Sequence, residues 1–162
     1  MNKLSLIYLG SFFLITSLIS FLNILYCYYF KIYFSLDAFV YLLLISLTIS
    51  FILFVQEKKN TKPNIFEKIL FVISGYLFIP LIFSVPYYFG NYNISFIDSY
   101  FESVSGFTST GFTIFDNIKH IDESLIIWRS STQWIGGIYF LFSIIFLIDI
   151  FDNNLKKSLT NF

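Results

Sequence analysis

The sequence predicts an all-α integral membrane protein with four transmembrane helices and one re-entrant, half-length helix that leads into a loop. Three observations predict this fold. The composition is 57% hydrophobic and only 12% charged, with a mean hydropathy of +0.76, which is typical of membrane proteins and not of soluble domains. Four apolar stretches are long enough to cross a bilayer as helices. Between the third and the fourth lies a semi-polar stretch, residues 95–111, that is too short to cross.

The first two crossings are predicted at residues 4–30 and 38–56. A signal peptide would have a shorter apolar region and a small-residue cleavage site, so we expect the first stretch to be a retained transmembrane helix. The second ends in a polar loop at residues 57–63, which is the clearest linker in the chain. An amino-terminal helix pair with its cytoplasmic linker is therefore predicted at residues 1–62.

The third crossing, residues 69–89, contains Gly75, Pro80 and Pro86. These residues would break a helix in water but are commoner in membrane helices, where neighbouring groups satisfy the freed carbonyls. Two interpretations stay open: a kinked outer helix of a pore, and simple packing.

A half-length helix is predicted to begin at Ser95, because Ser95 and Asp98 form a capping box with a carboxylate at the positive end of the helix dipole. About twelve residues at roughly 1.5 Å each span about 18 Å, around half the hydrocarbon thickness of a bilayer. Such a helix enters the membrane without crossing it. Residues 106–113 are then expected to be non-helical, which is tolerated at membrane depth only where protein buries the backbone or it lines a wet cavity.

That loop has the chemistry of a cation filter. Backbone carbonyls of an extended strand can replace the hydration shell of a cation, and Gly111 supplies dihedral angles that a side chain forbids. The alternative is an ordinary extracellular turn rich in serine and threonine.

The last crossing, residues 124–148, follows an acidic connector and precedes a tail at residues 153–162. If four crossings alternate, one set of lysines falls on one side of the membrane and the loop falls on the other. The positive-inside rule then predicts a cytoplasmic amino terminus, a cytoplasmic tail and an extracytoplasmic loop. The lysines concerned are Lys3, Lys58, Lys59, Lys62, Lys68, Lys156 and Lys157.

Two charged residues stand near the loop in sequence. Arg129, the only arginine, is either an interfacial anchor or a brace whose guanidinium pairs with Glu102 or with loop carbonyls. Glu102 needs a partner if the half-length helix buries it, whereas at an exposed position it would merely attract cations. Gly136 and Gly137 in the last crossing favour helix packing over a gating hinge.

Several classes of function are not indicated. The net charge is zero, so no basic field points to nucleic acid, and the partners suggested are lipid and other membrane helices. Cys27 is the single cysteine, and His120 is the single histidine and is interpreted as a solvated loop residue. No catalytic triad, phosphate-binding loop or dinucleotide-binding motif is visible, so we expect no enzyme activity and no cofactor.

Two motifs carry a family resemblance. Residues 101–111 read Phe-Glu-Ser-Val-Ser-Gly-Phe-Thr-Ser-Thr-Gly, and Trp-Arg-Ser at 128–130 and Gln-Trp-Ile-Gly-Gly at 133–137 follow them. In order and spacing they resemble the first pore repeat of the Trk/Ktr/HKT superfamily of potassium transporters, of the TrkH-like type. The resemblance implies a K+ filter at Thr108, Ser109, Thr110, Gly111, Phe112 and Thr113. It also implies a preference for K+, because members with serine at the position of Gly111 tend to admit sodium.

The resemblance implies partners as well. The family builds its pore from four consecutive repeats of helix, pore loop and helix, and this chain has room for one, at residues 63–152. The other repeats belong to a longer form of the same chain, to a separate chain, or to further copies of this chain. The family also implies a cytoplasmic nucleotide-binding regulatory subunit. A non-conducting membrane interaction protein, or a remnant that keeps the pore-loop fold, is the alternative function.

Overall fold

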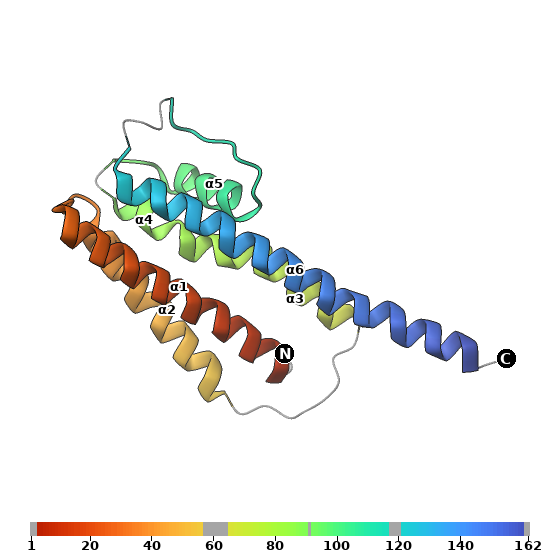
Figure 1. Ribbon diagram of the computed structural model, residues 1–162. Coiled ribbons are helices and arrows are strands. Elements are labelled where there is room, and N and C mark those ends of the chain that lie inside the picture. The colour runs from red at the N-terminus through yellow and green to blue at the C-terminus, as the bar shows by residue number, and fades with distance from the viewer. Residues whose placement is uncertain (1–2, 57–64, 91, 117–120, 161–162) are drawn as a thin grey trace.

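The computed structural model describes residues 3–56, 65–90, 92–116 and 121–160, and the regular secondary structure in these ranges is entirely helical (Figure 1). The predicted all-α class is therefore confirmed. Predictions about Lys58, Lys59, Lys62 and His120 lie outside the described residues, as do those about the side chains of Lys3, Lys156 and Lys157. The helices are α1 (Lys3–Phe30), α2 (Leu36–Val55), α3 (Ile65–Phe83), α4 (Val85–Phe89), α5 (Phe96–Phe107) and α6 (Glu123–Thr160).

Three helical segments within the described residues are long and apolar enough to span a membrane: Ile7–Phe30, Leu36–Val55 and Phe66–Phe89. They correspond to the first three predicted crossings. Residues 124–148 are helical as part of α6, but α6 is not among these three segments, so a fourth crossing stays a prediction.

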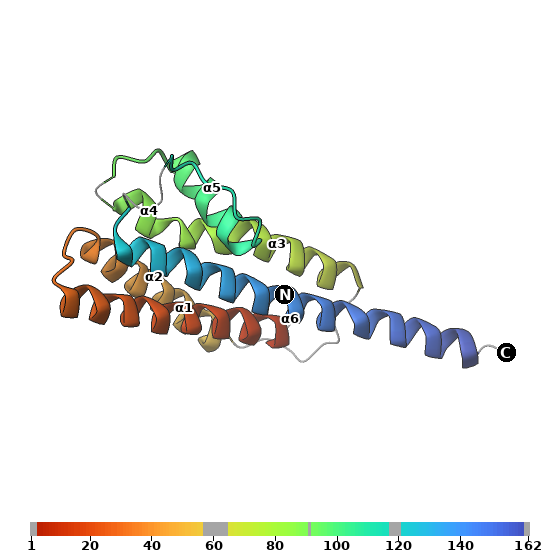
Figure 2. The same cartoon turned by 45° about the horizontal axis from the view of Figure 1, so that its top comes forward.

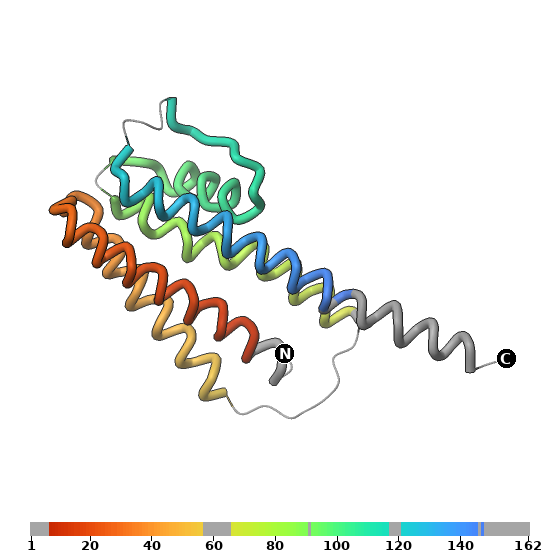
Figure 3. Tube along the Cα trace, viewed as in Figure 1, coloured from red at the N-terminus to blue at the C-terminus, as the bar shows by residue number. Residues whose placement is uncertain are grey.

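Helices α1 and α2 form an antiparallel hairpin whose members lie side by side along their lengths, as Figure 3 shows. Two buried serine hydroxyls join them: Ser20 Oγ donates to the Phe39 carbonyl at 2.7 Å, and Ser50 Oγ donates to the Gly10 carbonyl at 2.9 Å. Small residues allow helix backbones to approach this closely, and hydroxyls placed there bond across the contact. The hairpin packs against α6 through α1 and against α4 through α2.

The third predicted crossing is broken near its carboxyl end. Helix α3 includes Pro80 and ends at Phe83, and α4 begins at Val85 with Pro86 in its first turn. Because proline has no N–H, Pro86 cannot donate to the carbonyl four residues earlier, and the α3 hydrogen-bond ladder cannot pass through it. The interruption therefore lies next to Pro86, whereas Pro80 is accommodated inside α3.

A cluster of buried aromatic rings joins α3, α5 and α6. Trp128 is fully buried and its Nε1–H donates to the Phe83 carbonyl at 3.1 Å. Phe107, the last residue of α5, lies with its ring centroid 5.6 Å from that of Phe83 and 5.3 Å from that of Tyr139. Aromatic pairs in edge-to-face and tilted arrangements add to the energy of area burial. The carboxyl end of α5 is thus fixed against both long helices.

The start of α6 is tied to the loops at the same end of the molecule. The Asp122 N–H donates to the Tyr92 hydroxyl oxygen at 2.7 Å, and Ser35 Oγ donates to Asp122 Oδ2 at 3.1 Å. Burial raises the pKa of Tyr92, which keeps its hydroxyl neutral. These contacts place the amino end of α6 beside α4 and the loop between α1 and α2.

Candidate ion-binding loop

Helix α5 begins and ends close to where the sequence predicts. Ser95 is its N-cap: the Ser95 hydroxyl accepts the Asp98 N–H at 3.1 Å and donates to Asp98 Oδ2 at 2.7 Å. The helix has 12 residues, which corresponds to a length of about 18 Å. It lies over α3 and α6 at the end of the molecule that carries α4 (Figure 2).

The helix continues two residues further than predicted, because Gly106 and Phe107 belong to α5 and Thr108 is its C-cap. The chain then leaves through a Schellman motif, in which the Thr110 N–H donates to the Ser105 carbonyl at 3.1 Å and the Ser109 N–H to the Gly106 carbonyl at 3.0 Å. Ser109 has a φ of 56° and Gly111 a φ of 80°. Two left-handed residues so close together reverse the chain, and only Gly111 adopts that conformation without a side-chain penalty.

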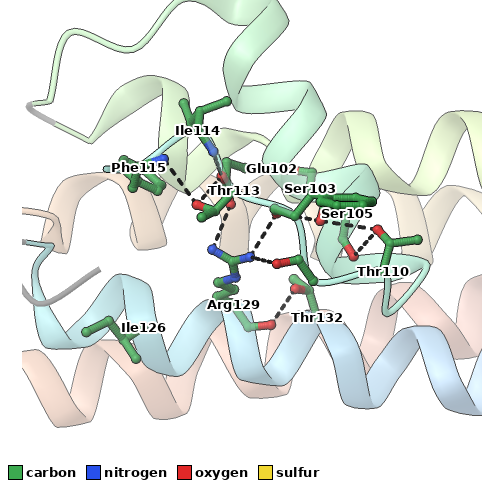
Figure 4. A network of polar contacts seen from close by, with 12 residues as sticks. Glu102, Ser103, Ser105, Thr110, Thr113, Ile114, Phe115, Ile126, Arg129 and Thr132 are labelled. Atoms are coloured by element: carbon green, nitrogen blue, oxygen red, sulfur yellow. Dashed lines mark hydrogen bonds and ion pairs between the residues drawn. The ribbon is translucent and has the colours of Figure 1, made fainter. Parts of the chain in front are cut away.

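Glu102 is completely buried on α5 and is surrounded by loop and helix donors (Figure 4). Its Oε1 accepts the Thr113 hydroxyl and the Ile114 N–H, each at 2.6 Å. Its Oε2 lies 3.2 Å from Nη1 of Arg129 as an ion pair. Of the two alternatives for Glu102, the structure shows the first: the carboxylate is buried and has hydrogen-bond and ion-pair partners. The carboxylate therefore joins the far end of the loop to α6.

Arg129 contacts both of the partners that the brace hypothesis considers. Besides the ion pair with Glu102, its Nη2 donates to the Gly111 carbonyl at 3.1 Å and to the Phe112 carbonyl at 2.9 Å. The side chain is buried, which excludes an anchor that extends to headgroups. Hydrogen bonds from a charged donor to carbonyls are stronger than those between neutral groups. Arg129 therefore fixes the loop to α6.

Sequence reasoning missed Ser105. Its hydroxyl donates to the Phe112 carbonyl at 2.6 Å, and the Thr110 hydroxyl lies 3.3 Å from both oxygens of Ser105. In one sequence, nothing distinguishes Ser105 from Ser103 or Ser99 on the same helix. Only the path of the loop assigns this contact to Ser105.

The six predicted filter residues all lie in this loop, and five of them are exposed: Thr108, Ser109, Thr110, Gly111 and Phe112. The carbonyls of Gly111 and Phe112 accept bonds from Arg129. Within the described part of the chain, the carbonyls of Thr108, Ser109, Thr110 and Thr113 accept no hydrogen bond. Carbonyl and hydroxyl oxygens suit hard cations, and the described residues contain no group of His, Cys, Asp and Glu that could hold a metal ion.

Two glycines let α5 and α6 meet beneath the loop. A Cβ on Gly106 would lie 2.5 Å from Thr132 Oγ1, and a Cβ on Gly136 would overlap the carbonyl oxygen of Phe107. By contrast, a Cβ on Gly137 would meet no atom within 4 Å. Gly136 therefore serves close helix packing, whereas Gly137 borders a shallow surface hollow of about 500 Å³.

Comparisons with known proteins relate the chain to cation transport proteins. The profile of the TrkH family, described as cation transport proteins, matches residues 35–161. An uncharacterized cation transporter of Methanocaldococcus jannaschii is 31% identical over 117 residues, which are 67% of this chain and 23% of that protein. The potassium uptake protein TrkI of Halomonas elongata is 38% identical over 66 residues, 41% of this chain and 12% of that protein. TrkG of Escherichia coli K12 is 26% identical over 86 residues, 52% of this chain and 18% of that protein.

The chain thus spans less than a quarter of the length of these relatives. They are transport proteins, which agrees with the prediction of transport and not enzyme activity. No solved structure matches the chain.

Proposed function

Because this chain belongs to the TrkH family of cation transport proteins, we propose that it is part of a potassium uptake transporter or channel in the cytoplasmic membrane. The observation that carries the proposal is a half-length helix followed by an exposed loop that contains a glycine. The buried Arg129–Glu102 pair joins this helix and loop to α6. Three relatives of the chain are named as cation or potassium transport proteins.

The proposed ion contacts use the loop carbonyls to which no described residue donates a hydrogen bond. Those of Thr108, Ser109, Thr110 and Thr113 are available within the described residues to replace water around K+. The negative end of the α5 dipole at Phe107 would favour a cation beside this loop. Gly111 and Phe112 contribute differently in this proposal, because Arg129 binds their carbonyls and fixes the turn between the ion-binding groups.

The proposed topology adds α6 as a fourth crossing. Residues 63–152 then form one repeat of helix, pore loop and helix, preceded by the helix pair of residues 1–62 and followed by a cytoplasmic tail at 153–162. The distribution of lysines supports a cytoplasmic amino terminus and an extracytoplasmic filter. In this arrangement α5 enters the membrane from outside and ends within it.

One repeat cannot surround an ion, so the proposal includes further pore repeats. Since the chain covers 23% or less of its relatives, we assign the missing part to segments that correspond to the rest of those proteins. The hollow on α6 is a suitable packing surface for such a segment because it is apolar and lies on the helix that bears Arg129. It is lined by Gln133, Trp134, Gly137, Ile138 and Leu141. The family resemblance alone suggests a cytoplasmic nucleotide-binding regulatory subunit as a further partner.

The test is K+ uptake in a potassium-uptake-deficient bacterium that expresses this chain, alone and together with the remaining repeats of a relative. Uptake by the chain alone would mean that copies of it close the ring. Uptake only with the added repeats would mean that they supply the other sides of the filter. Membrane insertion without uptake in either case would contradict the transport function and favour a non-conducting membrane interaction protein.

Gly111→Ser is expected to lower the preference for K+ over Na+ by about tenfold. A side chain at a φ of 80° costs roughly 1–2 kcal/mol, so the turn would relax and move the neighbouring carbonyls. Gly137→Ala is the matched control, because its Cβ would meet open space. Competition of Na+ with Rb+ uptake measures the preference, and an equal preference in Gly111→Ser and the parent would contradict this role of Gly111.

A further inference from the structure

Ser105 contacts the residues on both sides of Gly111. It lies in the last turn of α5 and is buried, with an exposed fraction of 3%. Its hydroxyl donates to the carbonyl of Phe112, which follows Gly111, at 2.6 Å. Its carbonyl accepts the N–H of Thr110, which precedes Gly111, at 3.1 Å. One residue of the rigid helix thus holds the turn at two points.

The Phe112 carbonyl has no capacity left for an ion. It accepts the Ser105 hydroxyl at 2.6 Å and the Arg129 Nη2–H at 2.9 Å, and a carbonyl oxygen has two lone pairs. Arg129 is long and shares its donors between Phe112, Gly111 and the Glu102 carboxylate. The short serine hydroxyl is bound to a helix that Phe107 anchors in the aromatic cluster, so it has far less freedom to follow the loop.

We infer that Ser105 is a positioning residue that sets ion selectivity: it keeps the Phe112 carbonyl away from the ion and fixes the peptides around Gly111, without touching the ion itself. This inference rests on the proposed transport function. Selectivity between K+ and Na+ depends on the number and geometry of the carbonyls that replace water. Loss of the Ser105 hydroxyl would free one of the two acceptor positions of the Phe112 carbonyl, although Arg129 still binds the other, and would loosen the turn. Both changes would favour a smaller cation.

The first test compares Ser105→Ala with Ser103→Ala in the transporter with all its repeats. Ser103 is likewise a buried serine on α5, but its hydroxyl donates to the Ser99 carbonyl of the same helix, at 2.9 Å. Ser105→Ala is expected to lower the preference for K+ over Na+ roughly five- to tenfold, as expected for one buried hydrogen bond, while total cation uptake persists. Ser103→Ala is expected to keep the preference. Equal preferences in the two variants would overturn the selectivity role.

The second test is hydrogen exchange of the peptide that covers residues 108–115 in the purified chain. Faster exchange in Ser105→Ala than in Ser103→Ala is expected, because only the first change frees the loop. Exchange needs no transport, so a parent that moves no cation even together with the remaining repeats would end the transport proposal, while exchange still decides whether Ser105 fixes the loop. Equal exchange in both variants would overturn that part, and faster exchange with an unchanged cation preference would again overturn the selectivity role.

Discussion

Gly136→Ala is expected to force α6 away from the carboxyl end of α5 and to lower the free energy of unfolding by about 3 kcal/mol, the upper end of the usual cost of overpacking. The new Cβ would overlap the carbonyl oxygen and carbon of Phe107 and lie 3.0 Å from its Cα. These are backbone atoms, so no side-chain rotation relieves the overlap. Because Phe107 is followed directly by the Thr108 C-cap, the displacement would also reach the loop and should abolish cation uptake.

Gly137→Ala is the matched control for this prediction. It makes the same chemical change one residue later on the same helix, where a Cβ meets no atom within 4 Å. Unfolding of the purified chain in mixed micelles should give a large loss for Gly136→Ala and a stability close to that of the parent for Gly137→Ala. Similar stability of the two variants would show that α5 and α6 do not approach as closely as described.

The half-length helix was predictable because its signals are local. Ser95 and Asp98 cap one another across a single turn, and the semi-polar composition of α5 contrasts with the apolar stretches on both sides. The predicted carboxyl end of α5 was two residues too early, because residues 106–113 were expected to be non-helical and α5 ends at Phe107. In the structure, the absence of a side chain at Gly106 serves its contact with Thr132 of α6, and the chain turns at Ser109 instead.

The partners of Arg129 were predictable only as one of two alternatives, a brace paired with Glu102 or with loop carbonyls, because the sequence does not tell a buried arginine from an interfacial anchor. The direction of each carbonyl was not predictable. The sequence treats residues 108–113 as one filter segment, whereas the contacts divide it into carbonyls held by Arg129 and carbonyls without a described donor. That division depends on the left-handed residues Ser109 and Gly111, and serine gives no sequence signal for such a conformation.

Removing one charge of the Glu102–Arg129 pair is expected to cost about 3–5 kcal/mol of unfolding free energy, because the remaining charge would be buried without its partner. Glu102 is completely buried and the Arg129 side chain is 10% exposed, so water cannot take over the missing partner. Glu102→Gln keeps an oxygen that can accept the Thr113 hydroxyl and the Ile114 N–H. Its effect therefore isolates the loss of charge, and Arg129→Gln should additionally release the loop carbonyls and reduce cation uptake.

The double variant Glu102→Gln/Arg129→Gln separates this mechanism from a general weakening of the fold. With neither charge present, no buried ion lacks a partner, so the loss of stability should be well below the sum of the two single losses. Glu123→Gln is the control, since Glu123 is exposed and accepts only the Tyr26 hydroxyl among the described contacts, at 2.9 Å. Additive single losses would mean that the two groups act separately. A double variant that regains stability but not cation uptake would assign to Arg129 the positioning of the loop, beyond its part in neutralising Glu102.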